Sequence, residues 1–118
     1  MLRCLLERAD RADEVRRLSI LHFNDVYDIS GAARFVNVVR QQAAADPLIL
    51  FSGDCYAPSI MSVVTKGSQM PPVLNAIGVQ AACFGNHEFD WGTQRCEELC
   101  AQVSACCART LDAPCHAH

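Results

Sequence analysis

The sequence lacks a run of about 18 consecutive apolar residues, the length that a membrane-spanning helix needs. It also lacks an excess of basic residues, because 10 lysines and arginines stand against 13 acids and the net charge is -3. We therefore expect no membrane span and no broad cationic surface for nucleic acid. Internal repeats and low-complexity segments are absent as well. With 118 residues, 51% of them hydrophobic, the chain is long enough for one small globular domain.

No C-x-x-C pair occurs among the eight cysteines, which removes the strongest spacing for a zinc ribbon or a thioredoxin-like redox site. Five of the eight fall within residues 96–118. Because no secretory signal is evident, free thiols in a reducing compartment are expected, and a disulfide framework is not. Cys55 and Cys83 are predicted to be small buried hydrophobes.

Residues 1–17 lack the unbroken apolar core of a signal peptide, since nine of them are charged. Their acids also argue against a transit peptide, so we expect a cytoplasmic protein. Apolar residues recur at helical spacing from Leu2 to Val15, which predicts an amphipathic helix added in front of the domain. Both charge signs share the polar face of this helix, so membrane association is the less favoured interpretation.

Three short apolar runs each end in polar residues, as buried strands of a parallel sheet do. They are RLSILHFND over residues 17–25, LILFSGD over residues 48–54 and VQAACFGN over residues 79–86. The order of strands and helices predicts an α/β domain, a βαβαβ unit with parallel strands and crossover helices.

The segments between these runs carry helix signals. A helix is predicted over residues 30–45, with Ser30 placed to cap it. A second helix would open at Pro58 and end at Gly67, and a third would occupy PPVLNAI, with prolines in its first turn and Gly78 just past its end.

Polar residues follow every predicted strand. Because the carboxyl ends of parallel strands meet at one edge of a sheet, we expect Asp25, Asp54 and Asn86 to converge. Carboxylate and amide oxygens can hold divalent cations, and one carboxylate can bridge two ions. His87 could protonate a leaving oxygen or donate to a phosphoryl oxygen, while Asp90 fixes its ring.

The segments ILHFNDVYD, LILFSGD and FGNHEFDWG, in this order, resemble the first three motifs of the calcineurin-like metallophosphoesterases, specifically of the 5'-nucleotidase branch. The similarity runs from residue 18 to residue 92, which we interpret as the amino-terminal part of a metallophosphoesterase domain. The resemblance implies hydrolysis of a small phosphate ester, such as a nucleotide, by water that two divalent metal ions activate. Manganese, magnesium, zinc and iron all remain open.

The resemblance also implies a role for each site residue. Asp25 would bind the first metal, Asp54 would bridge both, and Asn86 would bind the second. His87 would stabilise the transition state or protonate the leaving group, with Asp90 orienting it.

Tyr27 departs from the family pattern, because most members have a histidine at that position. A phenol is a poorer ligand near neutral pH, but similar relatives with tyrosine exist, so Tyr27 stays a candidate metal ligand beside a packing role. The family's later histidines, including a Gly-His-x-His motif, have no counterpart here, and we expect neither His116 nor His118 to replace them.

Residues 93–118 form a cysteine-rich, divergent tail, in which a helix is predicted over residues 93–110. The change suggests a truncated or aberrant product, which we expect to be weak or inactive as a hydrolase. One alternative is a catalytically incompetent fragment or binding module that keeps half of the metal site. Another is a zinc module that uses Cys106 and Cys107. Substrate identity and oligomeric state are not predicted.

Other residues near the motifs have simpler interpretations. His22 is predicted to be a hydrogen-bonded histidine of the core rather than a ligand. Glu88 is expected to shape the loop, and Trp91 to pack. Arg34 and Lys66 could meet phosphate, although solvated surface charge is the favoured interpretation.

Overall fold

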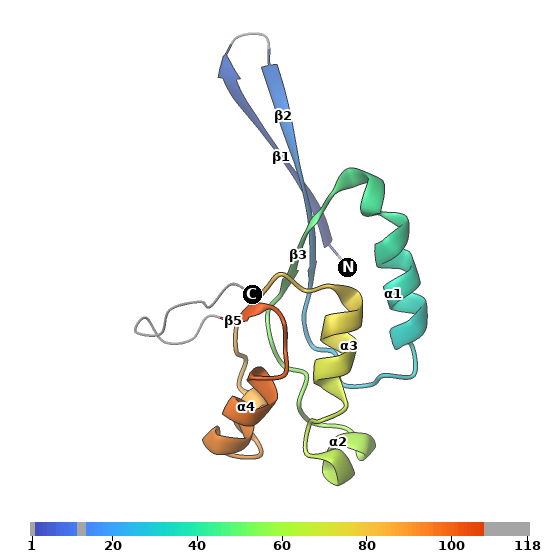
Figure 1. Ribbon diagram of the computed structural model, residues 1–118, viewed down its shortest axis with the longest axis vertical. Coiled ribbons are helices and arrows are strands. Elements are labelled where there is room, and N and C mark those ends of the chain that lie inside the picture. The colour runs from blue at the N-terminus through green and yellow to red at the C-terminus, as the bar shows by residue number, and fades with distance from the viewer. Residues whose placement is uncertain (1, 12–13, 108–118) are drawn as a thin grey trace.

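The computed structural model describes the backbone of residues 2–11 and 14–107 and the side chains of residues 17–105. A five-stranded sheet with its strands in chain order organises this part of the protein (Figure 1). The strands are β1 (Leu2–Arg11), β2 (Glu14–Phe23), β3 (Leu48–Phe51), β4 (Ala81–Ala82) and β5 (Cys106–Cys107). From β2 to β5 all neighbours are parallel, whereas β1 pairs antiparallel with β2.

Helices connect the parallel strands. They are α1 (Ala32–Gln41), α2 (Ile60–Thr65), α3 (Met70–Ile77) and α4 (Thr93–Cys100), with short 3-10 turns η1 (Ala43–Ala45) and η2 (His87–Phe89). Since α1 links β2 to β3, and α2 with α3 link β3 to β4, the predicted βαβαβ unit is confirmed. In the part of the chain that the structure describes, no helix is long and apolar enough to cross a membrane.

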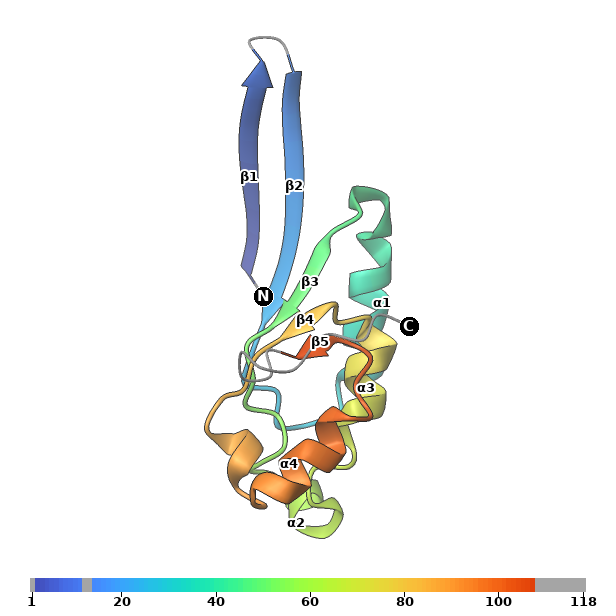
Figure 2. The same ribbon diagram turned by 60° about the vertical axis from the view of Figure 1, so that its left-hand side comes forward.

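The core lies between the sheet and the two helices α1 and α3, which lie side by side in both ribbon views (Figure 2). Alternate residues of β2, Leu21 and Phe23, point into this layer. The Phe23 ring is 5.1 Å from that of Phe35 on α1 and 5.0 Å from that of Phe51 on β3. Helix α3 contributes Leu74, which is buried beside them. This packing fixes the carboxyl ends of β2 and β3 next to each other.

The helix ends follow the predicted signals at α3 but not at α1, and α2 begins at Ile60, two residues after the predicted start at Pro58. The side chain and backbone of Ser59 form a reciprocal capping pair with Ser62 at the start of α2, and Gly78 ends α3 with φ 81°. The predicted cap at Ser30 is wrong, because Gly31 occupies the cap position. The Ser30 hydroxyl instead donates to Asp28 Oδ2 at 2.7 Å, so the nearby carboxylate takes the hydrogen bond.

The predicted amino-terminal helix is wrong. Residues 2–11 form β1, which pairs with β2 in a register that sets Leu2 opposite His22 and Leu6 opposite Leu18. The strand β2 accordingly starts at Glu14, upstream of the predicted run. A short helix needs a surface on which to bury its apolar stripe, whereas a strand beside β2 forms backbone hydrogen bonds along its whole length.

The predicted helix over residues 93–110 is too long, since α4 ends at Cys100 and the chain continues into β5. Asn75 on α3 explains the change of direction. Its side-chain nitrogen donates to the Gln102 carbonyl at 2.8 Å, and its oxygen accepts from the Ser104 N–H at 2.8 Å. Because these backbone groups are satisfied by Asn75, the helix need not continue.

Candidate metal centre at the strand ends

Asp25 lies just beyond β2, in the left-handed region at φ 55°. Its N–H donates to the Gly53 carbonyl at 3.2 Å, which ties the end of β2 to the end of β3. The Asp25 carboxylate accepts from the Tyr27 hydroxyl at 2.6 Å and from the Asn24 side-chain amide. These two donors hold the exposed carboxylate in one orientation.

Asp54 lies just beyond β3, one residue further from its strand than Asp25 is from β2, and is also left-handed, at φ 62°. Its Oδ1 accepts from the His87 backbone N–H at 2.9 Å, so the carboxylate joins the end of β3 to the turn that follows β4. Gly85 packs directly against it. A Cβ added at Gly85 would lie 2.1 Å from Asp54 Oδ1, so this carboxylate can occupy its position only because residue 85 has no side chain.

Glu88 is the functional residue that the sequence interpretation underestimated. It was predicted to shape the loop, and it does so with a buried carboxylate that is only 3% exposed. Glu88 Oε2 accepts from the N–H groups of Asp54 and Gly85, at 2.8 and 2.6 Å, and Oε1 accepts from the Cys55 N–H at 2.8 Å. The Glu88 carboxylate thus fixes the backbone of Asp54, Cys55 and Gly85, which forms part of the candidate site. The sequence feature that indicates this role is the three-residue spacing between Gly85 and Glu88. A Glu side chain can accept from a backbone N–H three residues earlier, as it does in a capping box.

His87 and Asp90 form the predicted pair. The Nδ1 of His87 lies 2.7 Å from Asp90 Oδ2, and the hydrogen bond to Asp90 raises the pKa of His87 above its ordinary value. Charges on Asp90, Asp54 and Glu88 act in the same direction, while desolvation opposes them. Both side chains remain accessible, at 30% and 39% exposed, so the ring can meet a ligand from solvent.

Tyr27 contacts both Asp25 and His87. Its ring is 5.7 Å from that of His87 and perpendicular to it, at 88°. The hydrogen bond to Asp25 is the main cause that raises the pKa of Tyr27 to about 12, followed by desolvation and by the charges of Asp25, Asp54 and Glu88. At neutral pH Tyr27 is therefore a neutral phenol that donates to Asp25.

No protein-family model matches the sequence. Over 97 aligned positions that cover 65% of this chain, it is 35% identical to bovine 5'-nucleotidase and 34% identical to human 5'-nucleotidase. It is also 28% identical to a Haemophilus influenzae NAD 5'-nucleotidase over 76% of the chain. The chain is thus similar to part of a 5'-nucleotidase, and we refer to it below as the 5'-nucleotidase-like domain. It spans less than a fifth of the length of these relatives, 17% of the bovine protein and 18% of the bacterial one.

The 5'-nucleotidase-like domain brings most of the predicted site residues together. Asp25, Tyr27, Asp54 and His87 are joined by the contacts given above, and Asp90 is joined to His87. Asn86 is exposed between Gly85 and His87, at the start of η2. The convergence of strand ends is therefore present in the fold.

The candidate metal ligands of the 5'-nucleotidase-like domain are chemically suited to a hard divalent cation, but they are too few to complete its coordination. Asp25, Asp54 and Asn86 offer the carboxylate and amide oxygens that magnesium and manganese take. Within the described residues, however, no group of three or more His, Cys, Asp or Glu side chains is placed to hold a metal ion. Residues 108–118, which include His116 and His118, lie outside the described part.

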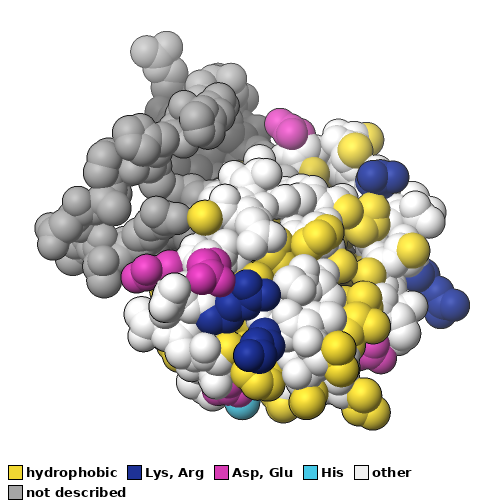
Figure 3. Space-filling view, turned by 60° about the horizontal axis from the view of Figure 1, so that its bottom comes forward, with side chains coloured by type: hydrophobic (Ala, Val, Ile, Leu, Met, Phe, Trp, Pro, Cys, Tyr) yellow, Lys and Arg dark blue, Asp and Glu magenta, His cyan; other side chains and the backbone are white. Residues whose placement is uncertain are grey.

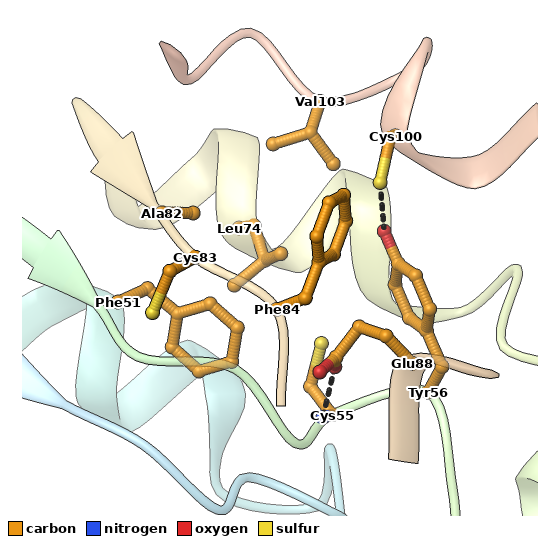
Figure 4. A pocket seen from close by; sticks show the side chains of 10 residues that line it. All are labelled: Phe51, Cys55, Tyr56, Leu74, Ala82, Cys83, Phe84, Glu88, Cys100 and Val103. Atoms are coloured by element: carbon orange, nitrogen blue, oxygen red, sulfur yellow. Dashed lines mark hydrogen bonds between the residues drawn. The ribbon is translucent and has the colours of Figure 1, made fainter. Parts of the chain in front are cut away.

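A small cavity lies beneath the site of the 5'-nucleotidase-like domain (Figure 4). Its volume is about 20 Å³, room for one water molecule and too small for a substrate. Glu88, Cys55 and Cys100 line it, and the Tyr56 hydroxyl lies 3.7 Å from Cys100 Sγ.

The cysteines of the 5'-nucleotidase-like domain that the structure describes with side chains form no disulfide bond with one another, as predicted: Cys55, Cys83, Cys96 and Cys100. Cys55 is buried, which confirms its predicted role as a core residue, and desolvation raises the pKa of its thiol. The prediction for Cys83 is wrong, since its side chain is exposed. Neighbouring strand residues point to opposite faces, and Ala82 takes the core side. The side chains of Cys106 and Cys107 are not described.

Two of the simpler interpretations are confirmed in the 5'-nucleotidase-like domain, and a third is confirmed in part. His22 Nε2 lies 2.6 Å from Ser52 Oγ, so this histidine is hydrogen-bonded as predicted, but it is only half-buried and is not the core residue that was predicted. Trp91 packs against the core and donates from Nε1 to the Tyr56 carbonyl at 3.1 Å. Arg34 and Lys66 are exposed.

Proposed function

We propose that this chain carries the amino-terminal part of a metal-dependent phosphoric-monoester hydrolase site whose substrate is a small phosphate ester such as a nucleotide. The observation that carries the proposal is the meeting of Asp25 and Asp54 at neighbouring strand ends, with the His87 backbone donating to Asp54. The relatives named 5'-nucleotidase support the same class of reaction.

In this proposal Asp25, Asp54 and Asn86 would hold divalent cations. Tyr27 is a further candidate metal ligand. Such ions, when bound, polarise phosphoryl oxygens and make bound water more acidic. His87 keeps its proton to a higher pH than an ordinary histidine because of Asp90, and it can donate that proton to a phosphoryl or leaving oxygen. The hydrogen bond at Nδ1 fixes the ring and leaves Nε2 for the ligand.

A second candidate is a half-site that binds phosphate or metal weakly and does not turn over. The limited set of metal donors among the described residues favours it, as does the small share of the relatives' length that the chain spans. We expect the chain by itself to be weak or inactive for this reason. A complete site would need donors beyond the described set.

The test is hydrolysis of 4-nitrophenyl phosphate and of a nucleoside monophosphate by the purified chain, with manganese and with magnesium. The proposed function expects turnover that a chelator abolishes and that Asp54→Asn lowers at least about 100-fold, as loss of a metal-holding residue does. Asp28→Asn is the matched control, since Asp28 is an exposed acid whose hydrogen bonds go to Ser30 and Ile29 within its own turn. Metal binding without turnover would support the half-site, and turnover that survives Asp54→Asn would contradict both.

A further inference from the structure

The hairpin of β1 and β2 extends beyond the rest of the sheet (Figure 1). Strand β3 pairs only with residues 20–23 of β2, so residues 14–19 have β1 as their one neighbour among the described strands. A ribbon of two strands is at best marginally stable in water, and a third strand is generally needed. The projecting part of the hairpin therefore lacks a neighbour that would stabilise it.

The outer edge of β1 is where such a neighbour can pair. Strand β1 is the end strand of the sheet, and among the described segments none lies beside its outer edge in Figure 2. An edge strand presents backbone N–H and C=O groups to which another strand can bind. The register with β2 is regular from Leu2 to Ala9 and shifts between Ala9 and Arg11, as at a β-bulge. Residues 2–9 are therefore the part of the edge that can form a regular ladder.

A second copy of β1 can pair with this edge only in certain registers. In an antiparallel pair related by a two-fold axis, residues directly opposite each other share one face of the sheet, so their numbers differ by an even number. Within residues 2–9 two such registers pair seven residues of each copy. One pairs residues 2–8 and is centred on Leu5, and the other pairs residues 3–9 and is centred on Leu6.

The charges of β1 distinguish these two registers. The register centred on Leu5 sets Arg3 opposite Glu7 of the second copy, and the two-fold axis repeats this pair of opposite charges. It also sets Leu5 opposite its own equivalent. The register centred on Leu6 sets Leu5 opposite Glu7 and brings no opposite charges together. Because opposite charges across two strands stabilise their pairing, the register centred on Leu5 is favoured.

We propose that residues 2–8 of β1 bind the same residues of a second copy of this chain, antiparallel and with Leu5 at the two-fold axis. The two hairpins then form one four-stranded ribbon with the two β1 strands at its centre. Each hairpin gains the third strand that it lacks. Charged residues on an edge strand ordinarily prevent pairing, but here Arg3 and Glu7 restrict it to a complementary partner in one register.

The test is sedimentation equilibrium of the purified chain in a reducing buffer, so that no disulfide joins two copies. We expect an equilibrium between monomer and dimer. Arg3→Glu sets Glu opposite Glu, and Glu7→Arg sets Arg opposite Arg, each at two places in the dimer. Either variant should therefore raise the dissociation constant of the dimer at least about tenfold. A mixture of the two variants should associate again, because in the mixed dimer every position 3 faces a position 7 of opposite charge.

Two control variants separate this edge from other surfaces. Asp10→Lys changes a charge on the same strand, but Asp10 lies at the register shift and outside the paired residues. Ile60→Ser changes the apolar surface of α2, at the opposite end of the molecule from the tip of the hairpin. Ile60 is 92% exposed there, and Figure 3 shows hydrophobic side chains gathered on that end. We expect neither variant to alter the dimer.

The outcomes decide whether β1 is the contact. A chain that stays monomeric at every concentration overturns the proposal. A dimer that persists in both charge-reversal variants overturns it as well, and so does a mixture that fails to associate. Dissociation by Ile60→Ser but not by Arg3→Glu would assign the contact to α2 instead. The mixture is decisive even where one substitution weakens the hairpin, since only pairing between residues 3 and 7 of different copies restores association.

Discussion

Glu88 and Asp54 are acids beside the same backbone turn, but their carboxylates lie in opposite environments. The Glu88 carboxylate is buried and accepts three backbone N–H groups. The Asp54 carboxylate is half-buried, accepts one backbone N–H from His87 and lies against Gly85. A buried anion with several donors stabilises a conformation, whereas an anion with spare acceptor positions can still bind a cation. This difference distinguishes Glu88, which holds the loop, from Asp54, which can bind a cation.

Substituting Glu88 should give the largest loss of stability. Glu88→Gln replaces one carboxylate oxygen by an NH₂ group, which faces backbone donors instead of accepting from them. We expect the free energy of unfolding to fall by about 3 kcal/mol, because buried N–H groups lose a charged acceptor. Urea denaturation followed by circular dichroism measures it.

The matched control is Glu98→Gln. Glu98 pairs with Arg95 at 3.0 Å on the surface of α4, where an ion pair is worth about 0 to 1 kcal/mol. Equal losses for the two variants would contradict the assignment of Glu88 as the residue that holds the loop.

Substituting Gly85 should affect the Asp54 carboxylate more than the fold. In Gly85→Ala the new methyl group would lie 2.1 Å from Asp54 Oδ1, so the carboxylate must move. We expect a loss of about 1 to 2 kcal/mol in the free energy of unfolding, as for other overpacked sites, together with weaker binding of manganese. Calorimetric titration with manganese checks the second effect.

Gly31→Ala provides the comparison for Gly85, since a Cβ at Gly31 meets no atom within 4 Å. It should leave both stability and metal binding unchanged. Unaltered manganese binding in Gly85→Ala would show that the Asp54 carboxylate is not held by this contact.

Substituting Asp54 should barely change stability. In Asp54→Asn the amide oxygen can still accept from the His87 N–H, and the backbone N–H of residue 54 can still donate to Glu88. We expect the free energy of unfolding to stay within about 0.5 kcal/mol of the original value. A melt by differential scanning calorimetry measures it. A loss as large as that of Glu88→Gln would mean that Asp54 is structural and would remove the contrast between the two acids.

Tyr27→Phe should have the smallest effect on the fold, because Tyr27 donates one hydrogen bond at the surface to Asp25. Removing that donor frees Asp25 Oδ1, so we expect manganese to bind several-fold more tightly. Weaker binding in the same titration would instead identify Tyr27 as a ligand, as the family position implies.

The central segments could be predicted because their signals are local. The run LILF gives β3 with the predicted bounds, and the prolines at the start of α3 and Gly78 at its end bracket a helix in the expected place. The apolar residues of 1–17 could not be assigned, since the edge that they pair with, β2, begins at Glu14, upstream of the predicted strand. In α4 the stop came from Asn75, a residue of a different helix.

The candidate site likewise has features that a local sequence pattern indicates and features that it does not. Convergence of Asp25 and Asp54 follows from parallel strands that end together, which a sequence pattern can indicate. The pairing of His87 with Asp90 follows from a spacing of three residues. Two of the three N–H groups that Glu88 accepts from belong to Asp54 and Cys55, which lie 34 and 33 positions away, so no local pattern contains them. Only the third, from Gly85, lies within a local spacing of three residues.

The sequence by itself determined the βαβαβ order, the three strand ends and the residue types that meet there, because periodicity and turn residues act within a few positions of each other. Only the tertiary structure decided which acid is buried and which is accessible to solvent, where α4 stops, and that residues 2–11 extend the sheet. Each of these depends on contacts between segments that are distant in sequence, since burial and hydrogen-bond satisfaction are properties of the packed chain.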